Sequence, residues 1–220
     1  MGSWKKSPIM KFLLSPVLPF YKAYCKSKWD KKWAEYVSQN ANIQLNVGAS
    51  VTRFEGWFPT DIEINSYYLD VTDEACYQKM LGDKKISKIL AEHVFEHLTT
   101  EQIQIALQLF YKYSTEDINI RIAVPDGFHT DSKYIEEVKI GGTGYGSDDH
   151  KQLFTYQSLG KLFEQAGFQS FPVEYWDENG VFHAGYQDDD KGLIRRSMLH
   201  DARNKDGKPN YTSLIMDFRK

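Results

Sequence analysis

Short apolar runs alternate with longer amphipathic stretches along most of this chain. Trp29, Trp33 and Val37 recur at the spacing of one helical face and predict a helix over 28–41. Apolar runs bounded by turn residues predict strands, and the amphipathic stretches between them predict helices. The predicted strands are 43–47, 57–62, 67–71, 86–91, 118–124, 168–176 and 212–218, and the further helices are 73–81, 101–113, 131–138 and 157–166.

This order of elements predicts the fold class. Strands that alternate with helices indicate an α/β, Rossmann-like three-layer sandwich with a mostly parallel seven-stranded sheet. The last two strands have no helix between them, which indicates an antiparallel edge hairpin. Pro59 cannot donate to a ladder, so we expect the second strand at an edge or irregular. One domain is predicted over 42–220, with a loop insertion at about 183–210.

Charge separates the N-terminal arm from this domain. Residues 1–34 hold eight lysines and one acid, although the whole chain has a net charge of -3. We expect a basic aromatic arm and lead-in helix over 1–41. The arm either contacts an anionic membrane peripherally or packs its aromatic residues on the domain. The acidic remainder argues against nucleic acid as a partner.

Composition indicates a globular protein in a reducing compartment. Hydrophobic residues make up 41% of the chain and charged residues 26%. No apolar run is long enough to span a membrane. Cys25 and Cys76 show no C-x-x-C spacing, so neither a disulfide framework nor a thiolate metal site is predicted. We therefore expect a cytoplasmic protein.

The first strand runs into a single glycine, Gly48, and Asp61 follows about a dozen residues later. The G-x-G-x-x-G spacing of a pyrophosphate loop is absent. This favours a cofactor without a diphosphate, and S-adenosylmethionine fits because its ribose hydroxyls suit a strand-end carboxylate. A glycine that only shapes a turn is the alternative.

Four titratable residues follow the fourth strand, namely Glu92, His93, Glu96 and His97. One interpretation is a zinc hydrolase, because His93-x-x-Glu96-His97 matches the H-x-x-E-H pattern of two histidines on one helical face. That motif needs a long helix and a further acidic ligand, whereas here it adjoins an apolar strand. The other interpretation is a cofactor-side loop after a strand.

The second interpretation is supported by a resemblance. Residues 91–98 resemble the "EHVxEHL" segment of the type 11 branch of class I S-adenosylmethionine-dependent methyltransferases. Residues 45–48 are similar to that family's "LNLGCG" loop, 56–62 to its "GWxxxDI" strand, and 123–127 to its fifth strand and following loop. The likeness covers about residues 43–220.

The resemblance implies a methyltransferase that uses S-adenosylmethionine. It implies that Gly48 lets the cofactor approach the backbone, that Asp61 binds the ribose and that Asp70 lies by the adenine. Ala49-Ser50 replaces the family's Cys-Gly, so a non-catalytic binding protein with this fold stays an alternative. The predicted cofactor-binding residues are Gly48, Ala49, Asp61, Asp70, Glu92 and His93, and no metal ligand is predicted.

The acceptor is expected to be a small molecule or glycan hydroxyl. Because the sulfonium methyl is already activated, the protein chiefly aligns the acceptor, and a general base assists a hydroxyl. His150 is the predicted base, and His93 and Glu96 are predicted to line the cofactor side. The glycine-rich stretch 141–146 lacks the Lys-Ser/Thr of a P-loop and is predicted as a substrate loop or linker.

Overall fold

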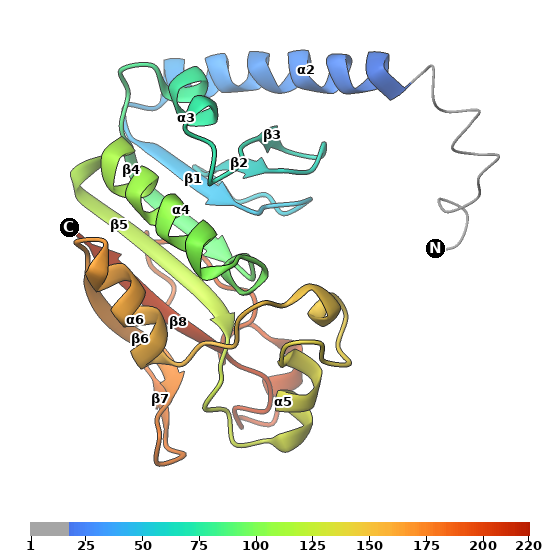
Figure 1. Ribbon diagram of the computed structural model, residues 1–220, viewed down its shortest axis with the longest axis vertical. Coiled ribbons are helices and arrows are strands. Elements are labelled where there is room, and N and C mark those ends of the chain that lie inside the picture. Colours follow the sequence, from blue (N-terminus) through green and yellow to red (C-terminus); the bar gives the residue numbers. More distant parts are fainter. Residues whose placement is uncertain (1–17) are drawn as a thin grey trace.

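The computed structural model describes residues 18–220 and contains one eight-stranded sheet in the order β3-β2-β1-β4-β5-β8-β6-β7 (Figure 1). The strands are β1 Ile43–Val47, β2 Phe58–Asp61, β3 Tyr67–Tyr68, β4 Ile86–Glu92, β5 Ser114–Pro125, β6 Gln169–Trp176, β7 Phe182–Ala184 and β8 Ser213–Arg219. The helices are α2 Leu18–Gln39, α3 Glu74–Leu81, α4 Thr100–Tyr113, α5 Ser132–Val138 and α6 Tyr156–Gln165, with short 3-10 turns η2 Phe95–His97, η3 Ser147–Asp149 and η4 Ala202–Asn204.

The predicted Rossmann-like α/β fold is confirmed. The strands β3, β2, β1, β4 and β5 are parallel to one another, and β8, β6 and β7 add antiparallel pairs at one side. The sheet has eight strands rather than seven because β7 pairs with β6 at the edge. Helix starts follow local capping: Asp73 accepts from Ala75 N before α3, and Thr99 forms a capping box before α4.

The two faces of the sheet are covered differently. The face that carries Ile89, Ile120 and Met216 packs in one large apolar core with helices such as α4 and α6, which lie across the front of the sheet in Figure 1. On the other face, Leu90 and Ala123 pack against the chain segment 185–212. The second outer layer is therefore an extended segment in place of helices.

A surface insertion was expected at about 183–210, but the segment 185–212 packs on the sheet. Ile194 and Ser197 within it are fully buried. Arg121 of β5 fixes it there: the guanidinium donates to Asp217 on β8 at 2.7 and 2.9 Å, and to Asp189 at 2.7 and 3.1 Å. Burial opposes this charge, but the hydrogen bonds that the guanidinium donates to the two carboxylates hold the pKa of Arg121 above its ordinary value.

The expectation for Pro59 was wrong, because β2 lies inside the sheet between β1 and β3. The Thr60 carbonyl accepts from Ala49 on the β1 side, and the Asp61 carbonyl accepts from Leu69 on the β3 side. Pro59 shares the orientation of Asp61 and therefore faces β3. Only two residues form β3, so no strand residue lies opposite the proline nitrogen. The strand predicted over 67–71 is shorter in the structure, because β3 covers only Tyr67–Tyr68.

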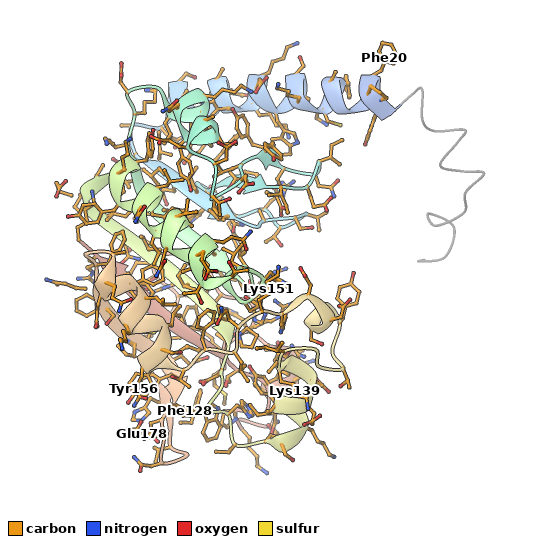
Figure 2. The ribbon with its side chains drawn as sticks, viewed as in Figure 1. Phe20, Phe128, Lys139, Lys151, Tyr156 and Glu178 are labelled. Carbon is orange, nitrogen blue, oxygen red and sulfur yellow. The ribbon has the colours of Figure 1, made fainter. Side chains whose placement is uncertain are left out.

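The lead-in helix begins earlier than predicted, since α2 starts at Leu18. Trp29 and Trp33 are buried as expected, and Trp33 Nε1 donates to the Met80 carbonyl at 2.7 Å. Phe20, labelled at the far end of α2 in Figure 2, is 79% exposed. The remainder of the predicted arm lies outside the described residues. Within residues 18–220, no helix combines the length and apolar character needed to cross a membrane.

Candidate active site

The carboxyl ends of the parallel strands meet at one edge of the sheet, where ligands bind in open α/β sheets. In Figure 1 this edge faces right, toward the loops that carry α5 and η3. The turn at Gly48 follows β1, Asp61 ends β2, and His93 follows β4. Residues that are distant in the sequence therefore share this edge.

Asp61 lies directly against the loop that follows β1. Its Oδ2 accepts from Ser50 N at 2.7 Å and its Oδ1 accepts from Glu63 N at 3.0 Å. The side chain is nearly buried, with the residue 9% exposed. The connection from β1 to β2 contains no helix, so the loop folds straight back over the end of β2. Asp61 therefore contacts the residue two positions after Gly48, and the cofactor-binding roles of Gly48 and Asp61 stay predictions.

Gly48 is required by the packing of the chain itself. Its φ is +66°, and a Cβ at this position would lie 2.2 Å from Val94 Cγ2. The Val94 side chain, in the loop after β4, thus fills the space beside the glycine. This contact explains a glycine here without a ligand, and a role in cofactor approach stays a prediction.

Two other predicted cofactor residues already have partners within the chain. Glu92 Oε2 accepts from Arg195 Nε at 2.9 Å, and Oε1 accepts from Arg196 N at 2.9 Å. Asp70 Oδ1 accepts from both the backbone and the hydroxyl of Thr72. Glu92 therefore anchors the 185–212 segment at the edge of the site, a role that its sequence context did not indicate.

The helical zinc hydrolase geometry considered from the sequence is wrong. His93 has a left-handed backbone, with φ of 57°, and only the single 3-10 turn η2 follows it. His93 and His97 are therefore not one helical turn apart on a long helix. The H-x-x-E-H pattern arose here from a strand end and a tight turn.

His93 is held between two side chains. Its Nε2 lies 2.9 Å from Ser213 Oγ, and its Nδ1 lies 2.9 Å from Glu96 Oε1. The contact with Glu96 is close but is not aligned as a hydrogen bond, so Glu96 acts on the ring mainly through its charge. Burial alone would raise the pKa of Glu96, but His93 and His97 hold it below its ordinary value. The ring of His93 is thus oriented by an anionic carboxylate.

His150, the predicted base, lies near His93 but has a different environment. Its Nδ1 donates to the Val138 carbonyl at 2.7 Å, so Nε2 carries the free lone pair. The Glu96 carbonyl accepts from Lys151 N and Gln152 N, which ties the loop after η3 to η2. Figure 2 shows Lys151 beside the start of α4. These contacts bring His150 to the site from far along the chain.

A cleft of about 200 Å³ opens beside both histidines. Tyr145 of the glycine-rich loop contributes to its wall, and the role of that loop as substrate loop or linker stays a prediction. Arg196 has no carboxylate within ion-pair distance among residues 18–220, and Arg203 pairs with Asp201. Neither arginine was predicted, because only the packing of 185–212 brings them here. The cleft is lined by His93, Pro125, Glu137, Val138, Gly144, Tyr145, Ser147, His150, Arg196, Arg203 and Tyr211.

A larger cleft, of about 670 Å³, lies between α2 and the β3 edge. It includes Trp29 of α2, Tyr68 of β3 and Cys76 of α3. None of the residues predicted for the active site lines it. Cys25 and Cys76, which both border this cleft, are not joined by a disulfide.

Solved structures of S-adenosylmethionine-dependent methyltransferases share this fold. The chain is similar to such an enzyme from Archaeoglobus fulgidus, with a TM-score of 0.52 and 18% identity over 96% of this chain and 93% of that one. It is also similar to the methyltransferase SibL in its apo form, with a TM-score of 0.50 and 10% identity over 83% of this chain and 51% of that one. No protein-family model and no curated protein matches the sequence. The fold implied by the resemblance is confirmed, and the type 11 branch stays a prediction.

Proposed function

We propose that this protein is a methyltransferase that transfers a methyl group from S-adenosylmethionine to a small-molecule acceptor. The contact between Asp61 and Ser50 N carries the proposal, because it puts a strand-end carboxylate next to the turn after β1. A carboxylate there suits the two ribose hydroxyls of the cofactor. The short β1–β2 connection offers no helix N-terminus for a diphosphate.

The arrangement favours an oxygen acceptor with His93 as its general base. In this proposal Glu96 orients the imidazole and stabilises the charge that forms when His93 takes the acceptor proton. The hydrogen bond with Ser213 Oγ indicates where the lone pair of His93 Nε2 would accept the acceptor's proton. The sequence favoured His150 as the base, but no carboxylate among residues 18–220 lies within hydrogen-bond distance of that ring. Glu96 is then a positioning residue.

The cleft charge favours an acidic acceptor, such as a small molecule or glycan that carries a carboxylate or phosphate. Arg196 and Arg203 both line the cleft beside His93. Guanidinium groups bind such anions through paired hydrogen bonds.

The two cysteines, which form no disulfide, support the expectation of a cytoplasmic location.

The non-catalytic alternative is favoured by one contact, the Val94 methyl that fills the space at Gly48. A protein that binds the cofactor without turnover would keep the Asp61 contact and lose the methyl-transfer step. Isothermal titration calorimetry with S-adenosylmethionine and S-adenosylhomocysteine tests both proposals. Absence of binding at millimolar ligand contradicts both. Binding to the wild type, combined with no methyl transfer to a panel of acidic hydroxyl compounds, favours the alternative.

A further inference from the structure

Three side chains of types that commonly bind metal ions lie close together beside the 200 Å³ cleft. Glu96 and His97 belong to η2, and His150 follows η3. One potential ligand atom from each residue lies within 4.8 Å of the other two. The two backbone segments are locked together, because the Glu96 carbonyl accepts from Lys151 N at 2.7 Å. The cluster is therefore built by the fold and not by a flexible surface.

The buried charge of Glu96 is paired at one oxygen only, where His93 Nδ1 lies 2.9 Å from Oε1. The Glu96 side chain is fully buried, and neither carboxylate oxygen accepts a hydrogen bond from the part of the chain that the structure describes. The contact with His93 involves Oε1 only and is not aligned as a hydrogen bond. Oε2 has neither a hydrogen bond nor an ion-pair partner among residues 18–220. Buried charges in proteins are normally paired, hydrogen-bonded or bound to a metal. The buried Glu96 carboxylate can therefore act as a ligand to a cation.

His150 has the arrangement that is common among metal-bound histidines. Its Nδ1–H donates to a backbone carbonyl, that of Val138, at 2.7 Å. This hydrogen bond fixes the tautomer and orients Nε2 as a ligand. The rings of His97 and His150 lie 4.9 Å apart between centroids. One carboxylate oxygen and two imidazole nitrogens are thus available to one ion.

The charges around the cluster also favour a cation. Asp149 Oδ2 lies 3.6 Å from His97 Nδ1, as a second carboxylate beside the cluster. One opposing charge is Lys151, whose ammonium donates to the His97 carbonyl at 2.7 Å and lies 3.6 Å from Asp149 Oδ1. Asp149 therefore offsets the lysine, and the buried Glu96 charge remains available for an ion.

We propose that Glu96, His97 and His150 bind one Zn²⁺ ion. Two histidines and one glutamate form a ligand set found in zinc sites that keep a fourth position open. Zinc bonds of about 2.0–2.2 Å require ligand atoms about 3.4 Å apart in a tetrahedral site, so the side chains move inward by roughly 1 Å on binding. His150 also lines the 200 Å³ cleft, so the open position adjoins the cleft. The H-x-x-E-H spacing includes Glu96 and His97, but it gave no sign of His150, which is far from them along the chain.

Zinc binding by the full chain tests this proposal directly. The metal-free protein is dialysed against micromolar Zn²⁺, and bound zinc is measured by elemental analysis. We expect one ion per chain, and at least tenfold weaker binding in each of Glu96→Gln, His97→Ala and His150→Ala. His183→Ala is the matched control, because His183 is exposed on β7 and pairs with Asp177. That variant should bind zinc like the wild type.

Two results overturn the proposal. One is a wild-type chain that binds no zinc, and the other is a His150→Ala chain that binds it as tightly as the wild type does. If His150→Ala fails to fold, His150→Gln, which keeps a side chain of similar length, takes its place. Zinc should raise the melting temperature of the wild type but not of Glu96→Gln. No S-adenosylmethionine is present in these measurements, so their outcome is independent of the proposed methyl transfer.

Discussion

Replacing Asp61 with Asn tests the cofactor side of the site most sharply. A carboxylate offers about four acceptor positions, and in this structure two are taken by the backbone N–H groups of Ser50 and Glu63. The remaining positions can accept the ribose hydroxyls. Hydrogen bonds to a charged group contribute about 1.5–3 kcal/mol, which corresponds to about 10- to 150-fold in affinity. We therefore expect Asp61→Asn to bind S-adenosylhomocysteine at least tenfold more weakly in calorimetry.

The control for this variant must disturb the same loop without touching the carboxylate. Ser66 Oγ donates to the Ser50 carbonyl at 2.7 Å, so Ser66→Ala loosens the loop and leaves Asp61 unchanged. We expect its affinity to stay within about threefold of the wild type, since a neutral hydrogen bond contributes about 1 kcal/mol to stability at most sites. An unchanged affinity in Asp61→Asn, or equal losses in both variants, would refute the ribose assignment.

Three further predictions concern stability and are measured by urea unfolding. Arg121→Ala should lower the free energy of unfolding by about 3–5 kcal/mol, because it leaves Asp217 buried without its partner. A loss below about 1 kcal/mol would contradict a stabilising role for the ion pairs of Arg121 with Asp189 and Asp217. Burial raises the pKa of Glu174 from 4.5 to about 7, so the folded state holds a proton that the unfolded state releases. Unfolding free energy should fall by up to about 3 kcal/mol between pH 4.5 and 7, and Glu174→Gln should flatten this slope and be more stable than the wild type at pH 8. Gly48→Ala should cost about 2–5 kcal/mol through its backbone strain and the clash with Val94, and adding Val94→Ala should recover part of that loss.

Local sequence patterns predicted much of this fold for identifiable reasons. Helices such as α3 begin at residues that cap their first turn, and the central strands are short apolar runs that alternate with them. Pro59 misled the prediction because its missing N–H matters only if a residue of β3 lies opposite it. The length of β3 decides this, and that length is a property of the assembled sheet. The burial of Ile194 was also hidden, because a loop-like composition gives no sign of the sheet face that it covers.

The site was predictable only where its residues are close in the sequence. Gly48 follows β1 and Asp61 ends β2, and their proximity follows from the parallel pairing of these two strands. Arg196 lies at the cleft because two contacts hold its segment in place: the ion pair of Arg121 with Asp189 and the hydrogen bond from Arg196 N to Glu92. Both contacts join distant parts of the chain. His150 meets Glu96 through backbone hydrogen bonds that no sequence pattern encodes. Long-range packing, rather than local propensity, completes the site.

A crystal structure of the chain with S-adenosylhomocysteine tests the central claim most directly. We expect the ribose within hydrogen-bond distance of Asp61 and the sulfur directed toward the cleft that His93 lines. A ligand bound instead in the cleft between α2 and β3, or one that leaves Asp61 without a contact, would contradict it.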